Sequence, residues 1–250
     1  MNEPSTQNPA GSPDHKSFGF WATLGILLGI IILWMILQVA TELLCGLAAN
    51  SMAPGIASTP ASGFTSISLS AIYILPGFIA LSLVFVFCKI KNPSIPEYLA
   101  LRRLKFTKYI PWVLIFALFA VALDRFCHGT GRLLGPEILY QAVGSGRYQP
   151  LLFTAVLLAA PVVEEVLFRG FAYRGLASTR FGPTPAIFIT SLIWALIHAF
   201  QYDAVLLALI FVAGIVLGIV RMRLKSVYPT IVMHSVMNLI AMVQITWAVS

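Results

Sequence analysis

Seven stretches of this chain are apolar over most of their length, and polar or charged residues gather in the connections between them. A helix that crosses about 30 Å of hydrocarbon needs roughly 20 apolar residues. We therefore predict seven membrane-spanning helices, at about 19–48, 64–88, 109–127, 150–176, 184–200, 204–221 and 228–248.

The composition agrees with this pattern. Hydrophobic residues make up 59% of the chain and charged residues only 10%, whereas soluble domains carry roughly 25% charged residues. The fold class is therefore all-α, a polytopic transmembrane helical bundle. We predict three parts: a disordered tail (1–17), N-terminal transmembrane helices with a basic loop (18–147), and a C-terminal transmembrane domain that carries the candidate chemistry (148–250).

Two connections have their own character. Residues 50–63 carry no charge and are rich in Pro and Gly, which predicts a short irregular loop. After Pro93 and Pro96, apolar and basic positions alternate from Glu97 to Lys105, which predicts a short helix lying on the membrane surface.

The basic residues fall on one side of the predicted topology. With alternating spans, every Lys and Arg except Arg125, Arg132 and Arg147 belongs to the side of the amino terminus. Positive charge favours the cytoplasmic side of a cell membrane, so we predict a multi-pass protein of the plasma membrane with a cytoplasmic amino terminus. This distribution accounts for the net charge of +7 without a nucleic-acid partner.

Three charged residues interrupt the fourth apolar stretch: Glu164, Glu165 and Arg169. An ionised side chain at the centre of a bilayer costs about 2.5–3.5 kcal/mol, so such residues face the bundle interior and serve a purpose. Glu165 and Arg169 are four positions apart and can pair on one helix face. Glu164 is rotated about 100° from Glu165 and has no partner within this stretch, which makes it the candidate working carboxylate.

Further polar residues occur at helical spacing in the last two thirds of this domain. Trp194 and His198 are four apart, as are His234 and Asn238, so each pair shares a helix face. The other polar or small-residue features are Gln201-Tyr202-Asp203 and the Gly214/Gly218 pair, whose spacing lets two helices approach closely. We interpret Trp194 and the two glycines as packing residues.

Taken in order, Glu-Glu-x-x-x-Arg, aromatic-x-x-x-His and His-x-x-x-Asn resemble the motifs of the CAAX-processing and bacteriocin-processing intramembrane protease family, which includes the Ras-converting endopeptidase of eukaryotes and the Abi-type bacterial membrane proteins. The resemblance covers roughly residues 148–240. One departure is Trp194, where the family usually has Phe.

The resemblance implies an intramembrane endopeptidase that opens toward the cytoplasmic side and acts on a membrane-associated protein or peptide, including a prenylated CAAX-type substrate. Glu164 and His198 would activate a water molecule, and His234 with Asn238 would stabilise the oxyanion or complete a polar cluster. Glu165 and Arg169 would hold the helix in register. A second version, in which zinc bound by Glu164, His198 and His234 activates the water, stays open because one Glu and two His also suit a zinc site.

Simple alternation places His198 near the outer end of its span and His234 near the inner end, more than about 10 Å apart in depth. A shared site therefore requires that the span at 184–200 be tilted, shortened or begin below the surface, or that the assignment of inside and outside fails locally. Two other functions remain. One is an Abi-like immunity or scaffold protein whose polar cluster only ties helices together. The other is a proton-coupled transporter, which the lack of an inverted repeat between the two halves argues against.

Overall fold

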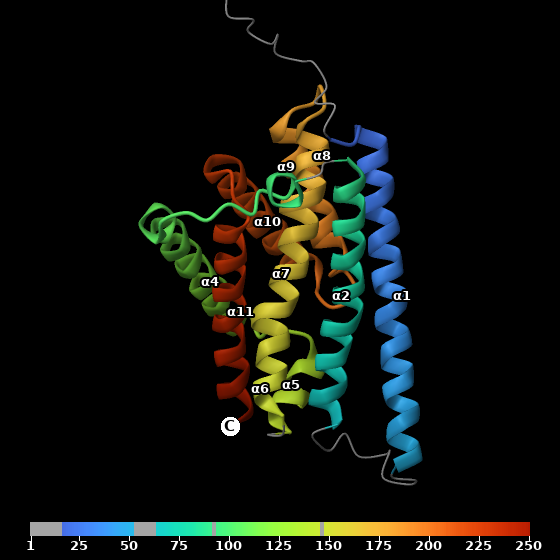
Figure 1. Cartoon of the computed structure of the whole chain (residues 1–250). Coiled ribbons are helices and arrows are strands. Elements are labelled where there is room, and N and C mark those ends of the chain that lie inside the picture. The colour runs from blue at the N-terminus through green and yellow to red at the C-terminus, as the bar shows by residue number, and fades with distance from the viewer. Residues whose placement is uncertain (1–16, 53–63, 92–93, 146–147) are drawn as a thin grey trace, which may run out of the picture.

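A computed structural model of the chain describes residues 17–52, 64–91, 94–145 and 148–250. Within these ranges the protein is a bundle of helices without strands (Figure 1). The predicted all-α transmembrane fold is thus confirmed. The tail at 1–16, most of the loop at 50–63 and Arg147 lie outside the described residues.

Six helical stretches are long and apolar enough to cross a membrane. They are α1 (Phe20–Met52), α2 (Phe64–Lys91), α4 (Ile110–Thr130), a compound helix at Gln149–Ala177, α10 (Ala204–Leu224) and α11 (Tyr228–Val249).

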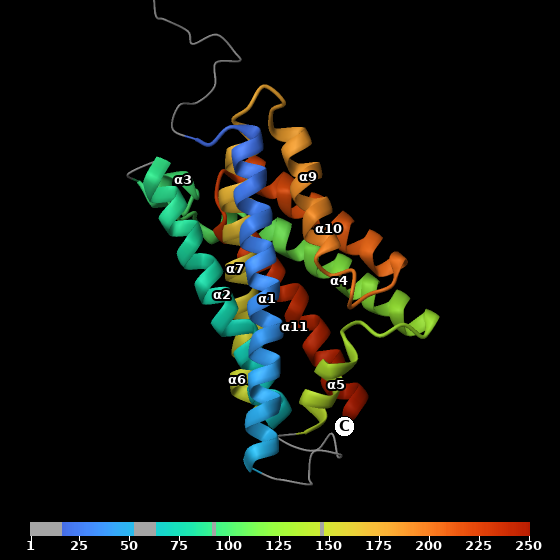
Figure 2. The ribbon, with the colours of Figure 1, turned by 90° about the vertical axis from the view of Figure 1, so that its right-hand side faces the viewer.

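The fifth predicted span, at 184–200, is wrong in its length. Helix α9 (Pro183–Leu196) has 14 residues, which is about 21 Å at 1.5 Å per residue and too short to cross the hydrocarbon. The chain then turns through residues 197–203 before α10 begins. Figure 2 shows that α9 ends about halfway along the length of the bundle, so the turn lies at the level of the middle of the long helices.

The compound helix forms the centre of the bundle. It consists of α6 (Gln149–Thr154), α7 (Ala160–Glu165) and α8 (Tyr173–Ala177), joined by π-helical segments at Ala155–Ala159 and Val166–Ala172. Of its most apolar window 61% is buried, against 22% to 39% for the other long helices. Three of its charged residues, Glu164, Glu165 and Arg169, are buried inside the protein.

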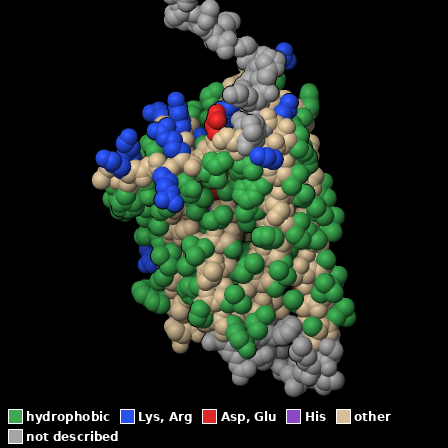
Figure 3. Space-filling view, in the orientation of Figure 1, with side chains coloured by type: hydrophobic (Ala, Val, Ile, Leu, Met, Phe, Trp, Pro, Cys, Tyr) green, Lys and Arg blue, Asp and Glu red, His purple; other side chains and the backbone are tan. Residues whose placement is uncertain are grey.

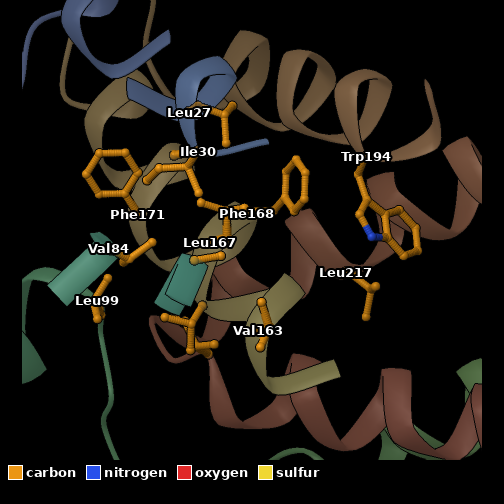
Figure 4. Packing of buried hydrophobic residues seen from close by; sticks show 14 of the residues in the cluster. Leu27, Ile30, Val84, Leu99, Val163, Leu167, Phe168, Phe171, Trp194 and Leu217 are labelled. Carbon is orange, nitrogen blue, oxygen red and sulfur yellow. The ribbon is translucent and has the colours of Figure 1, made fainter. Parts of the chain in front are cut away.

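The helices around the central helix pack in pairs, and they come from both halves of the chain. Helix α1 packs on α2, α9 on α10, and α4 on α11. Figure 4 shows side chains of the second π segment, Leu167, Phe168 and Phe171, in one cluster with Leu27 of α1 and Val84 of α2. This cluster fixes the rotation of the central helix.

The two glycines predicted to allow close helix packing do so. A Cβ on Gly214 would lie 2.9 Å from Ser191 Cβ, and one on Gly218 would lie 2.7 Å from Ile187 Cγ2, both on α9. Since real Cβ atoms do not approach so closely, α9 and α10 require glycine at both positions.

The predicted surface helix at Glu97–Lys105 is mostly wrong. Helix α3 (Ile95–Tyr98) ends after one turn, and Ala100 adopts a positive φ of 53°. The following residues are held instead by the α10–α11 connection, because Val227 N–H donates to Ala100 O (3.1 Å) and Ser226 Oγ donates to Arg102 O (2.6 Å). These contacts compete with continued helix.

Basic side chains are unevenly distributed. On the face in Figure 3 most Lys and Arg side chains gather at the end of the bundle near α3. Arg169 and Arg221, which the charge count assigned to that side, are instead buried in the bundle, with 1% and 6% of their surface exposed. The remaining asymmetry still supports a cytoplasmic amino terminus, which stays a prediction.

Candidate functional site

A buried group of three charged or polar side chains links the central helix to α11. Glu165 Oε1 accepts a hydrogen bond from Arg169 Nη1 at 2.9 Å and one from His234 Nδ1 at 3.1 Å. All three residues are at most 4% exposed. The predicted Glu165–Arg169 pair is therefore present, and the structure adds His234 as a second donor to the same oxygen. Below, this group is called the ion triad.

Arg169 is further held by α9 and α10. Its Nη2 donates to Gly214 O at 3.3 Å, and its guanidinium carbon lies 4.5 Å from the centre of the Trp194 ring. A cation over an indole face is favourable when both are desolvated. These contacts account for the burial of an arginine here and agree with a structural role for it.

Glu164, the predicted working carboxylate, has its partner on another helix. The indole N–H of Trp194 donates to Glu164 Oε2 at 2.6 Å. Trp194, interpreted from the sequence as packing alone, is 1% exposed and thus has a polar role as well. With Oε2 engaged, and with no hydrogen bond to Oε1 from the described residues, Oε1 is the oxygen of Glu164 that can bind a water or substrate.

His198 lies in the turn just after α9. Its Nδ1 lies 2.8 Å from Trp194 O, and because a carbonyl only accepts, this nitrogen carries the proton in the neutral ring. Nε2 is then the ring nitrogen that can accept a proton. The ring centres of His198 and His234 lie 5.6 and 5.4 Å from that of Trp194, so both imidazoles pack against the same indole.

These contacts resolve the difference in depth that simple alternation implied. Because α9 is short, its carboxyl end stops about halfway along the bundle rather than at the far surface (Figure 2). There the Trp194 ring of α9 lies 5.4 Å from the His234 ring of α11. A shortened span is one of the possibilities that a shared site allowed.

Asn238 is engaged with the first π segment. In that segment Ala160 N–H bonds to Ala155 O, and the next residue, Pro161, has no N–H to donate. Val156 O is thus left without these backbone donors, and Asn238 Nδ2 donates to it at 2.9 Å. Asn238 therefore has a structural role, and its second amide hydrogen remains available for other partners.

Arg221 plays the same part at the second π segment. Tyr173 N–H, which would serve Arg169 O in an α-helix, donates instead to Phe168 O and Gly170 O. Arg221 Nε donates to Arg169 O at 2.9 Å. Sequence reasoning missed this role, because Arg221 lies with Arg223 in the last turn of α10 and was counted among the basic residues at the membrane surface.

One cavity of about 590 Å³ unites four of the six predicted site residues. Glu164, His198, His234 and Asn238 line it, whereas Glu165 and Arg169 lie behind the wall. π-Helical turns recur at functional sites in proteins, and here they shape the helix that presents Glu164. The cavity walls are otherwise mainly apolar.

The position of the cavity along the bundle bears on the predicted opening. Its lining residues on α1, α2 and α11 belong to the parts of these helices that lie away from α3 and the basic segment (Figure 1). The cavity therefore lies toward the end of the bundle opposite the basic segment, and the opening toward the cytoplasmic side stays a prediction.

Other polar residues that line the cavity were only partly foreseen. Gln201 and Tyr202 come from the turn after α9, which the sequence had marked. Tyr73 comes from α2, where no motif pointed to it. Asp203 has a different role: its Oδ1 caps α10 by accepting from the amides of Val205 and Leu206.

The zinc alternative was tested against the positions of the donor atoms. Among the described residues, no three His, Cys, Asp or Glu side chains lie close enough together to hold one metal ion. In this arrangement Glu164, His198 and His234 do not fit a zinc site, and no metal enters the mechanism proposed below.

Comparison with known proteins agrees with the motifs. Residues 146–240 match the family model described as type II CAAX prenyl endopeptidase Rce1-like. This segment runs from the start of the compound helix into α11 and contains all six predicted site residues. No curated protein and no solved structure matches the chain. The resemblance found in the motifs is thus confirmed: residues 146–240 are similar to the Rce1-like type II CAAX prenyl endopeptidases.

Proposed function

We propose that this integral, multi-pass membrane protein is an endopeptidase that hydrolyses a peptide bond of a membrane-associated protein or peptide with a water activated by Glu164 and His198. The observation that carries this proposal is the single cavity lined by Glu164, His198, His234 and Asn238, which come from three separate stretches of the chain. The similarity to CAAX prenyl endopeptidases supports a substrate anchored near the bond that is cleaved, with a prenylated CAAX-type chain as the specific candidate.

Glu164 acts first as the general base. The Trp194 N–H orients its carboxylate, and Glu164 Oε1 takes a proton from the water as the water oxygen attacks the scissile carbonyl carbon. The second hydrogen of the water donates to Nε2 of His198. A tetrahedral intermediate forms, with the negative charge on the former carbonyl oxygen.

The oxyanion then needs hydrogen-bond donors already in position. Asn238 has one amide hydrogen beyond the one it gives to Val156 O. Tyr202 supplies a hydroxyl, and burial raises its pKa, so it stays protonated and able to donate. His234 hydrogen-bonds to Glu165 and so holds the α11 side of the cavity in place. Collapse of the intermediate breaks the C–N bond, and the protonated Glu164 returns its proton to the leaving amine.

A reporter assay in proteoliposomes tests this function. The substrate is a membrane-anchored peptide with a fluorophore and quencher on either side of the cleaved region. Glu164→Gln and His198→Ala are expected to melt like the native protein and to cleave at least about 100-fold more slowly. Glu97→Gln, an exposed acid far from the site, is the matched control. Normal turnover by Glu164→Gln would overturn the proposal.

The same assay separates the alternatives. Activity is expected to survive a chelator, whereas loss that zinc restores would replace the glutamate mechanism with a metal-dependent one. If Glu164→Gln alters the melting temperature and no peptide is cleaved by the native protein, the immunity or scaffold function is favoured.

A further inference from the structure

One face of α1 forms a wall of the cavity, although α1 lies outside the segment similar to the endopeptidases. Its lining residues recur at helical spacing: Ile31, Trp34, Met35, Gln38, Val39 and Glu42. Three of them carry polar atoms and are four positions apart, so they form a single line along the helix. Trp34, Gln38 and Glu42 are called here the α1 polar strip.

Trp34 contributes a buried donor. Its side chain is 6% exposed, and its indole N–H finds no hydrogen-bond partner among the described residues. A buried donor left unpaired costs about 1–3 kcal/mol, and buried tryptophans normally find a partner for this group. Trp34 lines the cavity, and a shift of its ring toward the open space would let a bound ligand that offers a carbonyl accept from this N–H.

Glu42 contributes a negative charge in an apolar helix. The candidate span Phe20–Ala48 has a mean hydropathy of 2.5, and the neighbours Leu43 and Leu44 are exposed apolar residues. Among the cavity-lining residues in the described part of the chain, Glu42 and Glu164 are the only acids, and neither Lys nor Arg is present. The charge of the cavity wall therefore favours a ligand with a positive group.

We infer that the α1 polar strip is a substrate-binding subsite for an extended, positively charged peptide. Trp34 and Gln38 hydrogen-bond its main chain, and Glu42 binds a Lys or Arg side chain or a free amino terminus. This inference rests on the proposed peptidase function and adds a charge preference to it.

The dimensions set the position of the positive group. Glu42 is eight residues beyond Trp34, which is about 12 Å along a helix. An extended peptide advances about 3.3 Å per residue. The cationic residue therefore lies about four positions from the peptide group that accepts the Trp34 N–H.

The test uses a set of membrane-anchored reporter peptides in which one residue is Lys, Gln or Glu, moved stepwise away from the cleaved bond. For native protein in proteoliposomes, kcat/KM is expected to be at least about tenfold higher for Lys than for Glu at one position. Glu42→Gln should abolish the preference, and Glu42→Lys should reverse it. Glu97→Gln should leave it unchanged.

Trp34→Phe separates the two parts of the subsite. It should lower affinity for all three peptides alike, by about tenfold, and keep the ratio of Lys to Glu. The same ratio in Glu42→Gln as in native protein would overturn the inference.

Peptide binding to Glu164→Gln, followed by fluorescence anisotropy, distinguishes failure of the subsite from failure of the function. Charge-dependent binding that Glu42→Gln removes, without any cleavage by native protein, would leave the subsite standing and disprove the peptidase. Cleavage by native protein without charge dependence would support the peptidase and disprove the subsite.

Discussion

The indole N–H of Trp194 donates to Oε2 of Glu164 at 2.6 Å, while the same ring lies 4.5 Å from the guanidinium carbon of Arg169. One aromatic side chain therefore joins the cavity carboxylate to the ion triad behind it. This relationship couples a residue proposed to do chemistry to residues that hold the fold, and it leads to the first prediction.

Trp194→Phe should keep the ring contacts and remove the donor to Glu164. Hydrogen bonds to charged groups contribute about 1.5–3 kcal/mol, so we expect kcat to fall by about 10- to 100-fold with little change in KM. Cleavage kinetics and thermal melting of the same preparation measure this. An unchanged kcat would mean that the indole N–H does not orient the carboxylate.

Glu165→Gln should destabilise the fold much more than Glu164→Gln does. Removing one member of a buried, hydrogen-bonded ion pair costs about 3–5 kcal/mol because the other charge is left uncompensated. Here Arg169 and His234 would both lose their anionic acceptor. Melting of the two variants in the same detergent provides the comparison, and equal melting temperatures would contradict a structural role for the triad.

Asn238→Ala should destabilise the fold because Pro161 has no N–H to replace the lost hydrogen bond. The variant leaves Val156 O unpaired inside the bundle, at a cost of about 1–3 kcal/mol. In a Pro161→Ala background residue 161 has an N–H, which can serve that carbonyl, so the cost should shrink. A double-mutant cycle on unfolding free energies measures this coupling. Additive effects would show that Asn238 and Pro161 act independently.

Gly218→Ala should destabilise the α9–α10 contact. Alanine favours a helix interior by up to about 1 kcal/mol over glycine, but the new Cβ would lie 2.7 Å from Ile187 Cγ2, and overpacking costs about 1–3 kcal/mol. We expect a net loss of about 1–2 kcal/mol. Gly29→Ala in α1, where no atom lies within 4 Å, is the control and should be neutral or stabilising. Similar shifts in melting for both variants would argue against the steric reason.

The turn that carries His198 should stay closed throughout the neutral range of pH. The backbone amide of Leu206 and the side chain of Arg132 hold the pKa of Asp203 below its ordinary value. Since the folded pKa is depressed, the contribution of the cap is present above the unfolded pKa of about 3.9 and is lost as the pH falls through the folded value. The amides of Val205 and Leu206 should lose their protection against hydrogen exchange, measured relative to the intrinsic rate at each pH, only in acid in native protein, but at every pH in Asp203→Ala. Fast exchange in native protein at pH 7 would contradict the cap.

The sequence determined the features that depend on local spacing and on the price of placing charge in an apolar segment. The helical bundle follows from the lengths of the apolar stretches. The Glu165–Arg169 pair follows from positions four apart on one helix, and the four cavity-lining residues were found because polar side chains are rare in such segments.

Only the tertiary structure decided which polar groups became partners. Trp194 for Glu164, His234 for Glu165 and Val156 O for Asn238 are contacts between residues at least 30 positions apart. They depend on where α9 stops and on how the π segments rotate the central helix. A periodicity of 3.6 residues reports the face of one helix, but it carries no information about the depth or crossing angle of the next, and these two quantities set the geometry of the cavity.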